Sequence, residues 1–339
     1  MKSDSSVAVS IPVHAWTPHF RAVLGSLKIQ TVPLEIAVMM TQEDPRILED
    51  LENSGLEFQY TRTGPDAGQA AAIAEGWAKT HSPILAWLNT DDTLTGDILP
   101  EVVSAFEQDA NLDVFYGQST VSDEGGTIWG QHPAVEPLSP LLRRTNIISQ
   151  PSCFFRRQAV EAIGGINPKL HYTMDWDLWL RLYEEGSKFK FSEHVLSNVT
   201  WAAETKTASL NLQRLVEFGK ILRRTQPLHK VAIGLSAVVR NNRLTYKSGQ
   251  DLAANSKPLI AADEAILLPI VNMHSMPKTQ LHVRHEPKNI VVTDSCGKAK
   301  IATVGNLTQI ELATAIKPGA AALLCIQGDS TKIHQIRWL

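Results

Sequence analysis

Residues 84–92, Ile-Leu-Ala-Trp-Leu-Asn-Thr-Asp-Asp, decide the fold of this chain. The first five are mostly large and apolar, which is typical of a strand that is buried on both faces of a sheet. Asp91 and Asp92 follow this strand. In an open α/β sheet, ligands bind where the strands end, and carboxylates at that edge suit a hard divalent cation. A pair of this kind, taken alone, more often caps the next helix, so the remaining motifs must decide between the two interpretations.

Strand-like and helix-like segments alternate around this stretch. The residue patterns predict strands over 7–13, 34–40 and 57–61, and helices after Pro18, after Asp44 and over 69–79. Such alternation favours a parallel sheet with right-handed crossovers. Downstream, we expect a helix from Thr95 or Asp97, strands over 112–117, 152–155 and 189–201, a hairpin over 121–129, and helices over 156–163, 174–186 and 212–222.

The character of the chain changes after Pro227. A helical piece over 231–240 precedes a polar link, and short runs rich in β-branched residues follow from about Ala265. The sequence therefore predicts a domain over 1–226, a helical linker over 227–260 and a small β-rich module over 261–339.

Composition and charge exclude several classes of protein. Of the 339 residues, 43% are hydrophobic and 20% are charged, as expected for a globular protein. The net charge of −3 and the absence of a dense basic run argue against a nucleic-acid partner. Three scattered cysteines suggest neither a disulfide framework nor a zinc site. We found no signal peptide and no apolar run of ~18–20 residues, so we expect a cytoplasmic protein, with attachment to the inner face of a membrane left open.

Five separated segments carry a family resemblance. They are Pro65-Asp66-Ala67-Gly68-Gln69, Leu88-Asn89-Thr90-Asp91-Asp92, Gln150-Pro151-Ser152, Gly164-Gly165-Ile166 and Met174-Asp175-Trp176-Asp177-Leu178-Trp179-Leu180-Arg181. In this order they resemble the donor-site, metal-binding, acceptor-side, glycine-turn and catalytic-base segments of the family-2 glycosyltransferases. The resemblance covers about residues 7–224 and implies an α/β protein of the GT-A fold, with a mostly parallel central sheet flanked by helices.

The resemblance also implies roles for individual residues. Asp66 would contact the base of a nucleotide-sugar of the UDP, dTDP or GDP type, and Asp91 would approach its ribose or the metal. Asp92 would bind a Mg²⁺ or Mn²⁺ ion that bridges the diphosphate, and Asp175 would be the general base of an inverting transfer to a glycan or lipid-linked acceptor. The residues predicted to bind substrate are Pro12, Asp66, Gly68, Gln69, Asp91, Gln150, Trp176 and Asp177.

Structural roles stand beside these functional ones. Asp175 and Asp177 lie in the first turn of a predicted helix, where carboxylates are stabilised by the helix dipole. Trp176 and Trp179 could pack in the core, or they could form a wall against the apolar face of a sugar. A homodimer and the role of the C-terminal module remain open.

The sequence also departs from the family pattern. Met40 or Thr41 stands where an acidic residue commonly ends the second strand, Thr200 and Ala202 replace an expected arginine and histidine, and Met174 replaces an acidic residue. These departures motivate a second hypothesis, a catalytically impaired domain that binds nucleotide-sugars or serves in assembly. A sugar-nucleotide pyrophosphorylase is a weaker third hypothesis, because Pro-Val-His-Ala-Trp over 12–16 stands where a glycine-rich loop is expected.

Overall fold

The computed structural model describes residues 6–122, 124–126, 128–132, 140–143, 146–200 and 211–226, together with residues 228, 231 and 235 and the strands between Leu259 and Trp338. The chain divides into two compact units, Met1–Ser119 with Ile148–Thr200, and Thr120–Ile147 with Trp201–Leu339. This division differs from the predicted boundary at residue 226. The predicted linker over 227–260 lies almost entirely outside the described residues.

The first unit is built on a curled sheet whose central path has the order β3-β2-β1-β4-β8-β6-β9-β5. Its strands are β1 (Val7–Val13), β2 (Leu34–Met40), β3 (Tyr60–Thr63), β4 (Ile84–Trp87), β5 (Asp92–Leu94), β6 (Leu112–Ser122), β8 (Cys153–Arg156) and β9 (Lys188–Thr200). The α/β class is confirmed, but the expectation of a mostly parallel sheet holds only for β3-β2-β1-β4. Beyond β4 the sheet is mixed, since β8 runs antiparallel to β4 and β6, and β5 antiparallel to β9. Buried parallel and antiparallel strands can share the same apolar pattern, so the sequence did not distinguish them.

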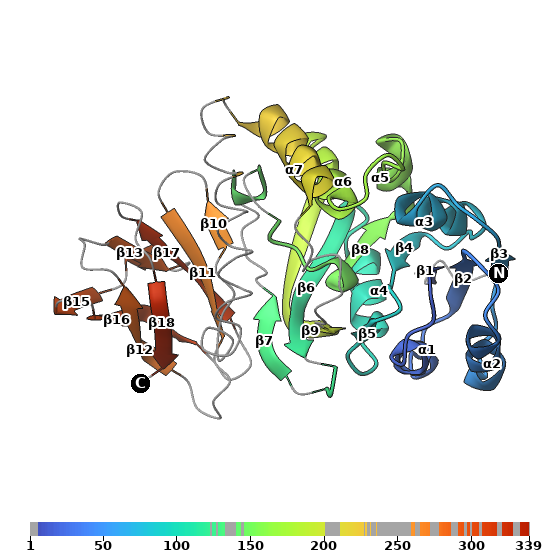
Figure 1. Cartoon of the computed structure of the whole chain (residues 1–339), viewed down its shortest axis with the longest axis horizontal. Coiled ribbons are helices and arrows are strands. Elements are labelled where there is room, and N and C mark those ends of the chain that lie inside the picture. The colour runs from blue at the N-terminus through green and yellow to red at the C-terminus, as the bar shows by residue number, and fades with distance from the viewer. Residues whose placement is uncertain are drawn as a thin grey trace. The chain divides into compact units, whose positions relative to one another are not determined.

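Helices lie on both faces of the sheet (Figure 1). They are α1 (Phe20–Lys28), α2 (Pro45–Ser54), α3 (Gln69–Ala78), α4 (Leu99–Gln108), α5 (Arg157–Ala162) and α6 (Met174–Glu184). Along β1, Val9 and Ile11 join the apolar cluster that contains the buried side chains of α1, α2 and α4. Ser10, between them, turns to the other face and donates to the carbonyl of Ile73 on α3 at 3.4 Å. The period-two alternation of a strand therefore assigns each helix layer its own residues.

The close approach of α3 to the sheet depends on Gly76. A Cβ at this position would lie 2.3 Å from Ser10 Oγ and 2.6 Å from Met39 Cε. Ala72 packs against Ala37 and Met39 on the same face. Small residues on α3 thus bring the helix, and the loop that precedes it, down onto β1 and β2.

Several predicted boundaries shift in the structure. The first two strands keep their predicted bounds, whereas β3 occupies residues 60–63 rather than 57–61. Asp92 opens the short strand β5 instead of capping a helix, and α4 begins only at Leu99. Asp97, predicted as a helix start, accepts hydrogen bonds from the backbone N–H and hydroxyl of Thr31 at 3.0 and 2.7 Å. The capping interpretation of Asp92 is therefore wrong.

In the second unit, every element described from Leu259 onward is a strand. One sheet has the order β10-β11-β17-β13-β14 and the other β15-β16-β12-β18, and neighbouring strands in both sheets run antiparallel. The strands are β10 (Leu259–Ala261), β11 (Ala265–Val271), β12 (Lys278–His285), β13 (Val291–Asp294), β14 (Gly297–Lys298), β15 (Lys300–Val304), β16 (Leu307–Ile316), β17 (Ala321–Gln327) and β18 (Ile333–Trp338). The unit also contains β7 (Ile128–His132), the 3-10 helix η1 (Pro140–Arg143) and α7 (Leu212–Thr225). Among the described helices, none combines the length and the apolar character that a membrane span requires.

Candidate active site

The loops that follow the parallel strands meet at one edge of the first unit. The hydroxyl of Thr17, in the loop after β1, donates to the carbonyl of Thr90 after β4 at 2.9 Å. The backbone N–H of Gly64, after β3, donates to the carbonyl of Met40 at the end of β2 at 3.0 Å. The carboxyl ends of four neighbouring strands therefore meet at one edge, which is where open α/β sheets bind ligands and where the sequence predicts a site.

Asp92 is a buried carboxylate at this edge, with 5% of the residue exposed. Its Oδ2 accepts a hydrogen bond from Asn89 Nδ2 at 2.9 Å. Burial raises the pKa of Asp92 well above its usual value, and the negative charge of Asp91 raises it further, whereas hydrogen bonds from Asn89 and the backbone of Thr200 act in the opposite direction. The ionised form of Asp92 is therefore unfavourable here unless a positive charge is brought close to it.

This charge and the oxygen donors suit a hard divalent cation. Asp91 and Asp92 could contribute carboxylate oxygens, which are preferred by Mg²⁺ and Mn²⁺. Among the residues that the structure describes, no three His, Cys, Asp or Glu side chains gather into a complete metal cluster. The chain thus offers a two-carboxylate donor set that would need further ligands from a bound molecule.

The donor-side segment forms a turn that leads into α3. Asp66 Oδ1 accepts from the backbone N–H of Gly68 at 2.8 Å, and its Oδ2 lies 3.4 Å from Arg62 Nη2. Gly68 has a φ of +114°, a conformation that glycine adopts most readily. A Cβ on Gly68 would lie 3.1 Å from Cε1 of His171, so the residue also allows close contact with the loop before α6. No local sequence pattern marks His171 as a residue of this site.

A chain of carboxamides joins three of the predicted segments. Gln69 Nε2 donates to Asn89 Oδ1 at 2.6 Å, and Asn89 Nδ2 donates to Gln150 Oε1 at 3.1 Å as well as to Asp92. Gln150 belongs to the 3-10 helix η2 (Gln150–Ser152) and donates through Nε2 to the carbonyl of Trp87 at 2.8 Å. Asn89 stands in the carboxylate motif, but the sequence does not predict it as a site residue. Its position directly after a buried strand, three residues before Asp92, was the available signal.

Asp175 lies at the start of α6, where its Oδ1 accepts from the backbone N–H of Trp176 at 2.7 Å. Its charge also acts on the thiol of Cys153, the first residue of β8. Burial raises the pKa of that thiol, and the charge of Asp175 raises it further. The charge of Asp175 therefore acts at the start of β8, which directly follows η2 and Gln150.

Two other predicted residues on α6 have structural contacts. Asp177 Oδ2 lies 2.8 Å from Arg181 Nε, and Arg181 also donates to the carbonyls of Ile163 and Gly165 at 2.9 and 2.7 Å. Trp176 is 1% exposed, so its ring packs in the core and presents no open face to a sugar in this structure. Their predicted roles in substrate binding remain untested.

Two positions that depart from the family pattern, Met40 and Thr200, lie near the same edge. Met40 ends β2 and is 3% exposed, and Thr200 ends β9 and is 9% exposed. Pro12, which the resemblance predicts to bind substrate, lies in β1 opposite Met39 of β2. Ala202 lies outside the described residues.

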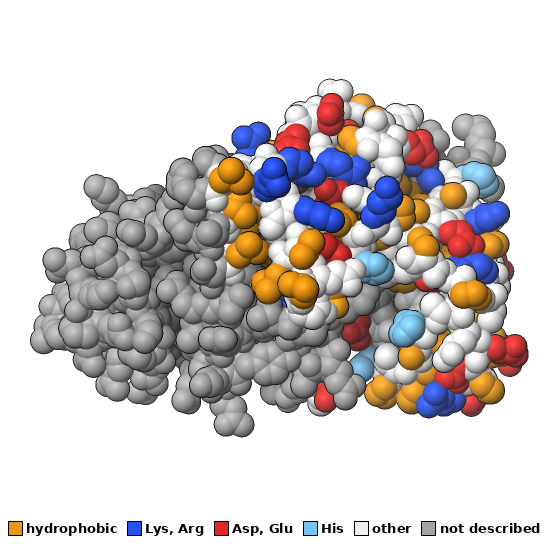
Figure 2. Space-filling view, turned by 45° about the horizontal axis from the view of Figure 1, so that its top comes forward, with side chains coloured by type: hydrophobic (Ala, Val, Ile, Leu, Met, Phe, Trp, Pro, Cys, Tyr) orange, Lys and Arg blue, Asp and Glu red, His pale blue; other side chains and the backbone are white. Residues whose placement is uncertain are grey.

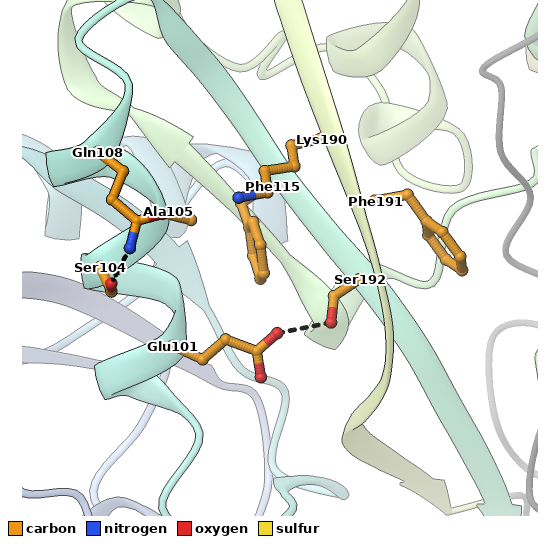
Figure 3. Close-up of a pocket in the computed structure, with 8 residues that line it drawn as sticks. All are labelled: Glu101, Ser104, Ala105, Gln108, Phe115, Lys190, Phe191 and Ser192. Carbon is orange, nitrogen blue, oxygen red and sulfur yellow. Dashed lines mark hydrogen bonds between the residues drawn. The ribbon is translucent and has the colours of Figure 1, made fainter.

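A pocket of about 200 Å³ lies elsewhere in the first unit, between α4 and strands β6 and β9 (Figure 3). Ser192 donates to Glu101 across it at 2.6 Å, and Gln108 donates to Ser104 at 2.9 Å. None of the residues that were predicted to bind substrate or metal lines this pocket. The candidate site is thus defined by side-chain contacts at the strand ends and not by this pocket.

Comparison with known proteins supports a glycosyl-transfer role for this arrangement. Residues 40–164 match the family described as glycosyl transferase family 2. No curated protein matches the chain. The structure of S. aureus TarS 1-349 in complex with UDP-GlcNAc aligns with a TM-score of 0.53 and 13% identity, over 72% of this chain and 74% of that one. The structure of S. aureus TarS aligns with a TM-score of 0.52 and 10% identity, over 98% and 77% of the two chains. The predicted resemblance and the GT-A fold are confirmed: residues 40–164, which hold Asp66, Asp91 and Asp92, match glycosyl transferase family 2 on a fold shared with TarS.

Proposed function

We propose that this chain is a metal-dependent, inverting glycosyltransferase. It would move a sugar from a nucleotide-sugar to a hydroxyl of a glycan or lipid-linked acceptor, in the synthesis of a surface polysaccharide. The observation that carries this proposal is the pair of hydrogen bonds at Asn89, which join Gln69 of the donor-side segment and Gln150 of the acceptor-side segment beside Asp92. The family match and the UDP-GlcNAc complex of TarS support the class of donor.

The carboxylates of the site have complementary tasks in this proposal. Asp91 and Asp92 would hold Mg²⁺ or Mn²⁺, and the bound ion supplies positive charge where the departing nucleoside diphosphate becomes more negative. Asp66, held in its turn by Gly68 and Arg62, would contact the base of the donor. Gln69, at the start of α3, would contact the donor beside Asn89.

Asp175 would act as the general base on the acceptor side. It would accept the proton of the acceptor hydroxyl while that oxygen bonds to the anomeric carbon and the bond from this carbon to the diphosphate oxygen breaks. Attack and departure on opposite sides of one carbon invert its configuration. The electrostatic effect of Asp175 on Cys153, the first residue of β8 after η2, supports this role.

The decisive experiment compares binding and turnover in the same variants. Transfer from a panel of nucleotide-sugars with Mn²⁺ is measured for the natural chain, Asp92→Ala and Asp175→Ala, with Glu52→Ala on the exposed side of α2 as a control for losing a carboxylate. We expect Asp175→Ala to lose about 10²–10⁴-fold in rate while keeping its affinity for UDP, as for removal of a general base. Unchanged rates in both site variants would refute the mechanism.

A second function is favoured by the buried Met40 and Thr200, which stand where the family pattern has an acidic residue and an arginine. The chain would then bind nucleotide-sugars without turnover, as an assembly subunit. Calorimetry separates the two functions, because binding across the panel without any transfer supports the second, and transfer at any rate above background dismisses it.

The cellular location also belongs to this proposal. We place the chain in the cytoplasm, with attachment to the inner face of the membrane where lipid-linked acceptors lie. On α7, Leu212 and Val216 are 77% and 46% exposed, and the exposed Lys220 and Arg223 follow on the same helix. Basic side chains also lie beside hydrophobic ones on the face drawn in Figure 2. A helix with exposed apolar and basic residues supports contact with an anionic lipid surface.

A further inference from the structure

We propose that Asn89 is a positioning residue that orients the carboxylate of Asp92 through a directional chain of carboxamides. This inference rests on the proposed function, because it assigns Asp92 to the ion and the donor diphosphate. It adds a residue for which neither the motif comparison nor the fold gives a role. The chain runs from the carbonyl of Trp87 through Gln150 and Asn89 to Asp92, with Gln69 as a branch.

The two ends of the chain determine the orientation of every amide between them. The carbonyl of Trp87 can only accept, so Gln150 must turn its Nε2 toward Trp87 and its Oε1 toward Asn89. An ionised Asp92 can only accept as well, so Asn89 must present Nδ2 to both Gln150 and Asp92. Its Oδ1 is then left to accept from Gln69. In each hydrogen bond, the donor and the acceptor are determined by the preceding bond. Only one orientation of the amides therefore pairs every donor with an acceptor.

Asn89 occupies the only branching point among these four contacts. Its two Nδ2 protons are divided between Gln150 and Asp92 at 3.1 and 2.9 Å, and its Oδ1 accepts the 2.6 Å bond from Gln69. An aspartate at position 89 would remove both donors and add a third carboxylate beside Asp91 and Asp92. An apolar residue would remove the contacts and leave the charge pattern unchanged. Comparing the two variants therefore separates the effect of added charge from the effect of losing the hydrogen bonds that orient Asp92.

A buried hydroxyl cluster supports the far end of the chain. Ser149 and Ser152 stand on either side of Gln150 and Pro151, and both bond to Ser119 on β6, at 2.6 and 2.8 Å between the Oγ atoms. Ser197 on β9 lies 2.6 Å from the Oγ atoms of both Ser119 and Ser152. All four serines are at most 1% exposed. The cluster ties η2 to two long strands, which gives Gln150 a rigid base.

A positioning role and a role in stability alone predict different results. If Asn89 only stabilises the fold, its loss lowers the unfolding temperature of the metal-free protein and leaves the affinity for the ion unchanged in the molecules that remain folded. If it orients Asp92, the affinity for the ion falls. Outer groups that orient a metal ligand typically contribute about 10- to 100-fold to affinity or activity.

The experiment uses the full chain with UDP and Mn²⁺. Calorimetry gives the dissociation constant of Mn²⁺ in the presence of saturating UDP, and thermal unfolding of the metal-free protein is measured in parallel. We expect Asn89→Leu to weaken Mn²⁺ binding by about 10-fold and Asn89→Asp to change it by a different factor, because the added carboxylate alters the charge. Asn53→Leu, at an exposed position of α2, is the matched control and should change neither quantity.

Gln150→Leu tests the next link and remains informative if the Asn89 variants fold poorly. We expect it to weaken Mn²⁺ binding less than Asn89→Leu, and the double variant to lose less than the product of the two single effects, because both changes interrupt one chain. Unchanged Mn²⁺ binding in Asn89→Leu and Gln150→Leu, with clear binding by the natural chain, would overturn the positioning role and leave the proposed function intact. An absence of Mn²⁺ binding by the natural chain with UDP would overturn both.

Discussion

Asp92 is a buried carboxylate whose negative charge lowers the stability of the folded protein. Its carboxylate is buried next to Asp91, and both burial and that neighbouring charge raise its pKa. The folded protein therefore binds a proton at Asp92 more tightly than the unfolded chain does. The stability associated with this proton is present below the unfolded pKa, about 3.9, and is lost as the pH rises through the raised folded pKa. Above that pH, the buried charge costs stability in the metal-free protein.

Asp92→Asn is expected to stabilise the metal-free protein at neutral pH. The amide removes the buried charge and keeps an oxygen that can accept from Asn89, so the free energy of unfolding should rise by about 1 kcal/mol at pH 7. The gain should shrink as the pH falls toward 4, where the natural carboxyl is protonated in the fold. The gain in the free energy of unfolding is measured by urea unfolding at several pH values. A variant that is less stable than the natural chain at pH 7 would contradict this account.

Asp177 provides a second prediction at the same scale. Its ion pair with Arg181 is largely buried, with the two side chains 6% and 23% exposed, and Arg181 in turn holds the carbonyls of Ile163 and Gly165. Asp177→Asn should lower the free energy of unfolding by about 1.5–3 kcal/mol, the range for hydrogen bonds to charged groups. The dissociation constant of UDP, measured by calorimetry, should change less than about twofold if the role is structural.

A matched control for this change is Asp44→Asn. Asp44 also pairs with an arginine, Arg46, but that arginine is 61% exposed, so the pair should contribute little. Asp44 accepts from the backbone N–H of Arg46 at the start of α2, and asparagine caps a helix as well as aspartate does. If Asp177→Asn instead keeps its stability and binds UDP poorly, then the prediction of Asp177 as a substrate-binding residue is supported.

At the scale of elements, the position of α3 depends on two glycines, which have no side chain to hold the backbone away from its neighbours. Gly76 allows the helix backbone to contact β1 and β2 directly, and Gly68 allows the preceding turn to lie against His171. This approach places Gln69, the first residue of α3, within hydrogen-bonding distance of Asn89. The position of Gln69, at the start of α3, therefore depends on how Gly76 packs near the other end of the helix.

Gly76→Ala is expected to destabilise the protein by about 1–3 kcal/mol, because the new methyl group overlaps Ser10 Oγ and Met39 Cε and forces α3 away from the sheet. Thermal and urea unfolding measure the loss. Gly25→Ala is the matched control, since a Cβ at this exposed position of α1 would meet nothing within 4 Å. That change should stabilise by about 0.5–1 kcal/mol through helix propensity. Equal effects of the two substitutions would refute the close-packing argument.

At the scale of the whole molecule, ligands should stabilise the natural chain in combination. Two carboxylates form an incomplete set for a divalent cation, so UDP and Mn²⁺ together should raise the unfolding temperature more than the sum of their separate effects. At a concentration 100 times the dissociation constant, binding to the folded state alone adds about 2.7 kcal/mol. Differential scanning fluorimetry with each ligand and with both measures this.

Asp92→Asn is the control for the ligand experiment, since it should retain the response to UDP and lose the additional response to Mn²⁺. The metal site is contradicted if Mn²⁺ raises the unfolding temperature of the variant and of the natural chain equally. That outcome would place the ion, if it binds, at another part of the molecule.

The sequence by itself determined the local elements and the chemistry at their ends. Strands β1 and β2 keep their predicted bounds and α3 begins at the predicted Gln69, because strand alternation, helix periodicity and turn residues act over a few neighbouring residues. The same holds for the carboxylates after β4, which lie at the edge where a strand-helix alternation places ligands.

Only the tertiary structure decided the direction of β8, the place of Asp92 at the start of β5, the burial of Trp176 and the contacts of Asn89. Each depends on residues far apart in the chain, such as Asn89 and Gln150, which are 61 positions apart. A single carboxamide has no local pattern that reveals its partners. Its role becomes visible only when the acceptors at both ends of the chain of hydrogen bonds are known.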